Sequence, residues 1–191
     1  MTEYLIALGS NLPLGEYDLT SILQKALDDL DQIAGVSVAR VSHWYRTPAW
    51  PEGSGPDFVN GAAALRSQKN PKEILQDLHG VEKALGRERR IRWGARTCDL
   101  DLIGAEELVL PSHDAVLSWI NSEPDRDRVP AELLLPHPRL QERAFVLVPL
   151  CDVAPGWVHP VLQHTAETMQ AALPEVARNE VVRLDSGSSF R

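Results

Sequence analysis

The most informative stretch of this sequence reads Arg92-Trp93-Gly94-Ala95-Arg96-Thr97-Cys98-Asp99-Leu100-Asp101. Residues 97–103 are expected to form a strand, in which side chains two apart point to the same face. The carboxylates of Asp99 and Asp101 would then project together, while the apolar residues around them point into the core: Cys98, Leu100 and Leu102. Because two neighbouring carboxylates repel each other, the pattern favours a bound hard cation such as Mg²⁺. A solvated pair at a strand edge is the alternative.

Positive charge is concentrated directly before this strand. Five arginines fall within ten residues, offset only by Glu88: Arg87, Arg89, Arg90, Arg92 and Arg96. The planar guanidinium group binds phosphate oxygens bidentately, and Mg²⁺ neutralises the oxygens on the other side. Arginines next to paired carboxylates therefore indicate a phosphoryl-transfer site, although a charged run is more often a solvated loop. No P-loop motif and no G-x-G-x-x-G fingerprint is present.

Length and composition indicate a globular protein of one domain. The chain has 191 residues, 43% of them hydrophobic and 24% charged, with a formal net charge of −8. This charge argues against a general binder of nucleic acids or anionic membranes. Cys98 and Cys151 suggest neither a disulfide scaffold nor a zinc site. With no signal peptide and no long apolar run, we expect a cytoplasmic protein without a membrane or nucleic-acid partner.

Hydrophobic periodicity predicts an α+β fold. Strands are expected over residues 4–8, 36–45, 58–65 and 97–103, and helices over 17–33, 71–85 and 163–173. The order strand, helix, strand, strand, helix, strand favours a ferredoxin-like sheet with helices packed on one face.

The sequence also suggests how the single domain, residues 1–191, is organised. Residues 105–135 are polar and rich in Asp, Glu and Pro, and we interpret them as an insertion. The core is expected to cover about residues 1–160, and a C-terminal helix and tail about residues 161–191.

The first stretch closely resembles the signature R-W-G-P-R-T-x-D-L-D of the hydroxymethyl-dihydropterin pyrophosphokinases. Further motifs of that family occur in matching order. They are the first strand and loop at residues 6–11, Y-x-T-P at 45–48, D-[FY]-x-N at 57–60, P-H-x-x at 136–139 and R-x-F at 143–145. The resemblance extends over roughly residues 1–160.

This resemblance implies a reaction and its cofactors. The terminal diphosphate of ATP would be transferred to 6-hydroxymethyl-7,8-dihydropterin in tetrahydrofolate biosynthesis, leaving AMP. Asp99 and Asp101 would hold two Mg²⁺ ions between the ATP phosphates and the attacking hydroxyl. Arg87 and Arg96 would stabilise charge on the transferred diphosphate. We expect the enzyme to act as a monomer.

The resemblance also implies binding residues. Those expected to hold the nucleotide are Glu82, Arg89, Arg92, Leu102, His137 and Arg143. Thr47, Pro48 and Asn60 would contact the polar edge of the pterin. Phe58 and Phe145 would sandwich its ring, and Trp93 would close over it. From the residues alone, Phe58 and Phe145 would be core aromatics, His137 part of a surface turn and Asn60 a strand-edge amide.

Two other functions stay open at this point. The arginine cluster with Trp93 could belong to a nucleic-acid-binding module, whose binding should fall steeply with salt. A two-metal nucleotidyltransferase or phosphohydrolase could also use the Asp99–Asp101 pair. The loop between Gly86 and Trp93 is one residue shorter than the family's form, so the alignment of Arg89 and Arg90 stays open as well.

Overall fold

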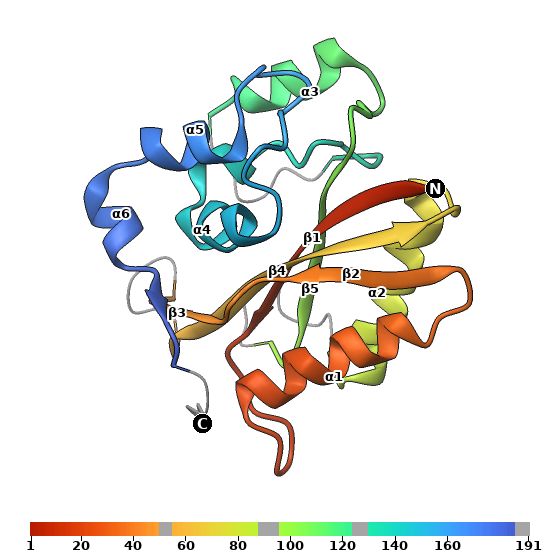
Figure 1. The fold of residues 1–191 in the computed structure, drawn as a ribbon, viewed down its shortest axis with the longest axis vertical. Helices are drawn as coiled ribbons and strands as arrows, with labels where there is room; N and C mark the ends of the chain where they lie inside the picture. The colour runs from red at the N-terminus through yellow and green to blue at the C-terminus, as the bar shows by residue number, and fades with distance from the viewer. Residues whose placement is uncertain (50–54, 88–95, 124–129, 186–191) are drawn as a thin grey trace.

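A computed structural model describes residues 1–49, 55–87, 96–123 and 130–185 (Figure 1). Its centre is a six-stranded antiparallel sheet in the order β5-β1-β4-β3-β6, with β2 also paired with β4. The strands are β1 (Thr2–Ser10), β2 (Val36–Val41), β3 (Tyr45–Thr47), β4 (Phe58–Ser67), β5 (Asp99–Ala105) and β6 (Val182–Arg183). The predicted α+β class is confirmed.

The single strand predicted for residues 36–45 is wrong, because residues 42–44 divide it into β2 and β3. The Ser42 hydroxyl accepts a hydrogen bond from the Ala62 backbone N–H at 2.9 Å and donates one to the His43 carbonyl at 2.7 Å. Trp44 then packs over Gly61, occupying the space that a Cβ would need. Both strands pair with β4, so the division redirects the chain without leaving the sheet.

Helices cover both faces of the sheet, whereas one covered face was predicted. Helices α1 (Leu19–Asp31) and α2 (Pro71–Ala84) pack on one face, and α4 (Ala144–Val153) with α5 (Ala166–Ala172) packs on the other (Figure 1). The central strand β4 explains this, because it is apolar on both sides. Its Ala63 and Leu65 face α1 and α2, while Ala62 and Ala64 face α4.

Residues 105–135 are more structured than their polar composition suggests. Ala105 and Leu135 belong to the main core, and between them lies helix α3 (His113–Ile120). Ser112 caps this helix by accepting a hydrogen bond from the Ala115 N–H at 3.3 Å. A small separate core forms around Val116, with Leu134 and Val161.

The C-terminal segment completes the sheet and the second core. After the short 3₁₀ helix η1 (Leu140–Glu142) and α4, helix α5 contributes Met169 to the core beneath α4. Helix α6 (Glu175–Asn179) leads into β6, which pairs with β3.

Among the described residues, no helix is long and apolar enough to span a membrane. Both cysteines are free thiols.

Candidate active site

Strand register brings the predicted site residues together at one end of the sheet, on the α4 face. Gly9 of β1 lies opposite Asn60 of β4 on one side and opposite Asp99 of β5 on the other. Thr47 of β3 lies opposite Phe58 of β4. The residues expected from sequence to bind the pterin and those expected to bind the metal are therefore neighbours across four strands: β3, β4, β1 and β5.

Asn60 and Thr47 form a buried polar pair. The Asn60 side-chain amide donates a hydrogen bond to the Thr47 hydroxyl at 2.7 Å, and both residues are at most 6% exposed. The remaining amide oxygen of Asn60 faces Gly9, where an added Cβ would come within 2.9 Å of it. Glycine at position 9 therefore leaves room for the Asn60 amide and for any group that it binds. The sequence motif contained Gly9, but its role depends on this strand pairing.

Each carboxylate oxygen of Asp99 pairs with a predicted catalytic arginine. Arg87 Nη1 lies 2.5 Å from Asp99 Oδ1, and Arg96 pairs with Oδ2. Arg87 also pairs with Glu82, which is 1% exposed and accepts a hydrogen bond from the Leu100 N–H at 2.8 Å. Glu82 was expected to hold the nucleotide, and in this structure it joins α2 to β5 and to Arg87.

Asp101 has the electrostatic character expected of a cation ligand. It lies on the same face of β5 as Asp99, and its side chain is half-buried. Burial and, next, the negative charge of Asp99 raise the pKa of Asp101 to about 6, although Arg143 opposes the shift. Two oxygen-donor carboxylates on one face of a strand fit Mg²⁺, which takes one or two protein carboxylates and completes its shell with phosphates and water.

The loop after β1 holds the backbone that carries Arg96. Asn11 Oδ1 accepts from the Arg96 N–H at 2.8 Å, and the Arg96 carbonyl accepts from the backbone N–H groups of Asn11 and Leu12 at 3.0 and 3.1 Å. The Ser10 hydroxyl donates to the Thr97 carbonyl at 2.6 Å, where the chain was expected to be in a strand already. Sequence reasoning missed Ser10 and Asn11, and only their place in the matching motif hinted at a role.

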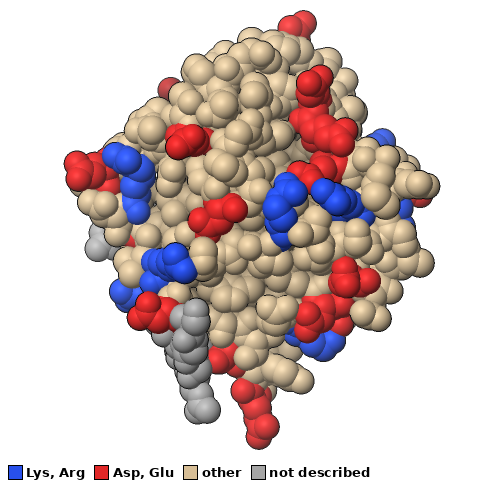
Figure 2. Space-filling model, viewed as in Figure 1, with Lys and Arg blue, Asp and Glu red and all other residues tan. Residues whose placement is uncertain are grey.

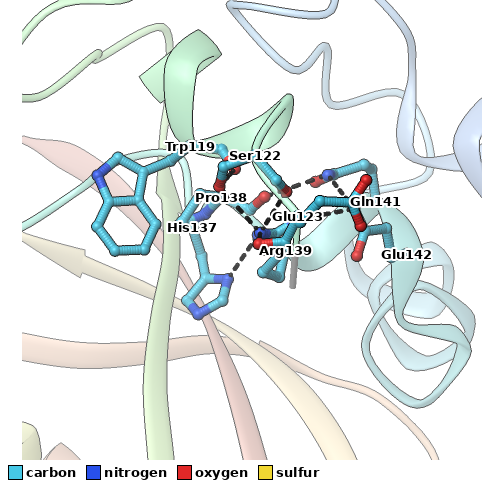
Figure 3. A network of polar contacts seen from close by, with 8 residues as sticks. All are labelled: Trp119, Ser122, Glu123, His137, Pro138, Arg139, Gln141 and Glu142. Carbon is cyan, nitrogen blue, oxygen red and sulfur yellow. Dashed lines mark hydrogen bonds and ion pairs between the residues drawn. The ribbon is translucent and has the colours of Figure 1, made fainter. Parts of the chain in front are cut away.

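His137 is placed at the open edge of β5. Its backbone N–H donates to the Ile103 carbonyl at 3.0 Å, and its Nδ1 accepts from the Arg139 N–H at 3.1 Å (Figure 3). Burial, followed by the positive charge of Arg143, lowers the pKa of His137 to about 3. The imidazole is therefore neutral, with its proton on Nε2.

The Arg139 side chain connects this turn to the end of α3 (Figure 3). Its Nη2 donates to the carbonyl and hydroxyl oxygens of Ser122 at 2.7 and 3.1 Å and to the Glu123 carbonyl at 3.3 Å. Its Nη1 pairs with Glu142 at 3.2 Å. Arg139 thus anchors the expected insertion to the turn that bears His137, a role that no sequence pattern indicated.

The other predicted residues are distributed as follows. Phe58 is half-buried, and Pro48 is exposed next to β3. Phe145 lies in the first turn of α4, with the Arg143 guanidinium carbon 5.7 Å from its ring centre. Leu102 packs its side chain in the core, and its backbone belongs to the edge strand β5, where it pairs with Ile6. The last three predicted residues lie outside the described residues: Arg89, Arg92 and Trp93.

Residues 5–155 match the family model for 7,8-dihydro-6-hydroxymethylpterin-pyrophosphokinase (HPPK). The chain belongs to this family. It is thus an HPPK-family enzyme, and the family's activity is pyrophosphoryl transfer from ATP to hydroxymethyldihydropterin in folate biosynthesis. The resemblance seen in the sequence motifs is confirmed.

Curated relatives and solved structures agree with this assignment. The 2-amino-4-hydroxy-6-hydroxymethyldihydropteridine pyrophosphokinase of Methylorubrum extorquens is 32% identical, and the match covers 97% of this chain and 100% of the relative. The Synechocystis enzyme of the same name is 41% identical, with coverage of 72% and 61%. A crystal structure of Plasmodium falciparum HPPK-DHPS shares the HPPK fold with a TM-score of 0.62 at 13% identity. That match covers 89% of this chain and 44% of the Plasmodium chain.

Proposed function

We propose that this chain transfers the terminal diphosphate of ATP to the hydroxymethyl oxygen of 6-hydroxymethyl-7,8-dihydropterin, releasing AMP. The observation that carries the proposal is the arrangement around Asp99. Two arginines contact its carboxylate, and Asp101 lies on the same face of the same strand. Positive groups for a polyphosphate and oxygen ligands for its counter-ions are thus adjacent, as phosphoryl transfer requires.

Asp99 and Asp101 are the proposed protein ligands of two Mg²⁺ ions. No group of three or more His, Cys, Asp and Glu side chains suited to a metal occurs within the described ranges. A site of two carboxylates suits Mg²⁺, because this ion keeps most of its shell for phosphates and water. When bound, Mg²⁺ would neutralise phosphate oxygens that the arginines do not reach.

Arg87 and Arg96 are proposed to exchange Asp99 for the phosphates of ATP. A guanidinium group binds carboxylate and phosphate with the same planar geometry, so ATP can replace Asp99 as its partner. The exchange would free Asp99 for the cation while both arginines contact the transferred diphosphate. Because Asn11 holds the Arg96 backbone, Arg96 can change partner through its side chain alone.

The pterin is proposed to bind over Gly9, between Asn60 and the Asp99–Asp101 pair. The amide oxygen of Asn60 and the hydroxyl hydrogen of Thr47 would pair with donors and acceptors on the polar edge of the ring. Phe58 and Phe145 would contact its flat faces, with Pro48 at the rim. This orientation would direct the hydroxymethyl oxygen toward the carboxylate pair.

On the nucleotide side, His137 and Arg143 are the described residues proposed to contact ATP. The neutral His137 can donate from Nε2, because its Nδ1 already accepts from the Arg139 backbone. Arg143 at the start of α4 adds positive charge near Asp101. The hydroxyl attacks the β-phosphorus in line, and a loose transition state needs little help from a base, so alignment and charge neutralisation supply the catalysis.

Product analysis tests the proposal. With Mg²⁺, ATP and the dihydropterin, AMP and a dihydropterin diphosphate should form in equal amounts. Released pyrophosphate or ADP would instead indicate a nucleotidyltransferase or phosphohydrolase.

Nucleic-acid binding is the less favoured alternative, because Lys and Arg form small groups interspersed with acidic side chains on the face drawn in Figure 2. We also propose that the protein is cytoplasmic and acts as a monomer.

A further inference from the structure

Three hydrogen-bond donors converge on one carboxylate oxygen of Asp152, near the C-terminal end of α4. Asp152 Oδ2 accepts from the Tyr45 hydroxyl at 2.8 Å and from the His43 backbone N–H at 3.0 Å, and it lies 2.9 Å from His43 Nδ1. Tyr45 is buried, and burial together with the Asp152 hydrogen bond raises its pKa. Its hydroxyl therefore remains a donor at neutral pH.

The two elements joined by Asp152 carry opposite parts of the proposed pterin site. Strand β3 runs from Tyr45 to Thr47, and Thr47 holds the Asn60 amide. Helix α4 begins beside Arg143 and carries Phe145 in its first turn, while Asp152 lies near its C-terminal end. The charge of Arg143 acts on Asp101 of β5, and Asp152 bonds Tyr45 of β3, so α4 crosses the sheet between these strands.

We propose that Asp152 is a positioning residue that sets the separation of Thr47 and Phe145 by fastening α4 to β3. The inference rests on the proposed function, because it assigns these two residues to the pterin. Strand β3 has three residues and is held within the sheet by β4 and, at Tyr45 and Arg46, by β6. These ladders do not set its distance from α4, whereas the Asp152 contacts do, on the face where the pterin would bind, so that this spacing need not be set by the substrate as it binds.

Arg40 offers a matched comparison within the same structure. Its Nε donates to the Val153 carbonyl at 2.9 Å, and its Nη2 pairs with Glu3 at 2.5 Å. Arg40 therefore holds the same end of α4, but to β2 and β1 instead of β3. Removing the Arg40 side chain should loosen the end of α4 without releasing Thr47. The Arg40 variant therefore distinguishes a general loss of protein stability from loss of the contact that holds β3 to α4.

The test measures two affinities for each variant by calorimetry. In the first titration, 6-hydroxymethyl-7,8-dihydropterin is added to protein saturated with Mg²⁺ and the nucleotide analogue α,β-methylene-ATP. In the second titration, α,β-methylene-ATP is itself the ligand. Tyr45→Phe and Asp152→Ala should weaken pterin binding about tenfold, as loss of a positioning hydrogen bond does. Affinity for the nucleotide analogue and kcat at saturating pterin should change less than twofold. Asp152→Asn keeps an acceptor oxygen and should recover part of the loss.

Arg40→Ala should lower the unfolding temperature while leaving pterin affinity within twofold of the unaltered protein. Unchanged pterin affinity in Tyr45→Phe and Asp152→Ala would overturn the inference, and so would an equal loss in Arg40→Ala. These results would leave the proposed function standing, provided the unaltered protein binds the pterin and forms AMP. An unaltered protein that binds no pterin would overturn both.

Discussion

A guanidinium nitrogen of Arg87 lies 2.5 Å from Oδ1 of Asp99, on the strand that carries the proposed metal ligands. The same guanidinium group also pairs with the buried carboxylate of Glu82. Arg87 thus connects the end of α2 with the start of β5. Arg96 approaches the other oxygen of Asp99 but has no comparable buried partner among the described ion pairs. The two arginines should therefore differ when each is removed.

Both arginine variants should lose activity far more than they lose nucleotide affinity. We expect Arg87→Ala and Arg96→Ala to lower kcat at least about 100-fold, because each contacts charge that develops in the transition state. Single-turnover kinetics beside equilibrium ATP binding would measure both effects. Arg66→Ala, at the opposite end of β4, is the control and should change neither. Equal losses of binding and rate would show that the arginines only attract anions.

The stability of these two variants should diverge. Arg87→Ala leaves the buried Glu82 carboxylate without this guanidinium group and should lower the free energy of unfolding by about 2 kcal/mol or more. Arg96→Ala should cost less than about 1 kcal/mol, since its partner Asp99 is only half-buried. Urea unfolding of both proteins checks this, and an equal cost would contradict a separate role for Glu82.

Asp101→Asn should abolish turnover without destabilising the protein. The raised pKa of about 6 means that the folded state disfavours the charged form of Asp101, so its ionisation lowers stability as pH rises through 6. Asparagine removes that charge, and the unfolding temperature at pH 7 should stay equal or increase. Activity in Mg²⁺ should fall by several orders of magnitude. Near-normal activity, or a marked loss of stability, would refute the role given to Asp101.

Gly9→Ala should weaken pterin binding. The added Cβ would lie 2.9 Å from Asn60 Oδ1, so the amide must shift from its hydrogen bond with Thr47. We expect about a tenfold loss of pterin affinity and a stability cost of about 1–2 kcal/mol. Gly80→Ala is the matched control, because no atom lies within 4 Å of its added Cβ. In the middle of α2 it should stabilise the protein by up to about 1 kcal/mol and leave pterin affinity unchanged.

Stability should fall on mild acidification because of His159. This residue is fully buried, and its Nδ1 accepts from the N–H groups of Val161 and Leu162 at 3.2 and 3.1 Å. Burial lowers its pKa to about 4, so the unfolded state binds its proton first and stability is lost as pH falls below about 6.5. His159 should contribute about 2 kcal/mol to the loss at pH 5, separately from His137, whose pKa is also lowered by burial. His159→Asn keeps an acceptor but cannot titrate, and an undiminished pH dependence in that variant would exclude His159 as its source.

Several features could be predicted from the sequence because they depend on local spacing. The alternation in residues 98–102 correctly placed the carboxylates opposite the core-facing Leu100 and Leu102. The apolar stripes predicted α1 and α2, whose observed starts are set by caps at Asp18 and Asn70. The order of the short motifs identified the family, because the residues of each motif are neighbours in the sequence and can be recognised without knowing the fold.

Only the tertiary structure decided how these pieces meet. Glu82 was expected from the sequence to hold the nucleotide, and only the packing of α2 on β5 showed that its carboxylate is buried against the Leu100 N–H. The Asn11–Arg96 and Tyr45–Asp152 contacts join residues 85 and 107 positions apart, and strand order and register determine which such residues become neighbours. Hydrophobic periodicity predicts which side of a helix or strand is buried, but it does not predict which other element packs against that side. For that reason the sequence determined the chemistry of Asp99 and Asp101, whereas the fold decided which side chains position them.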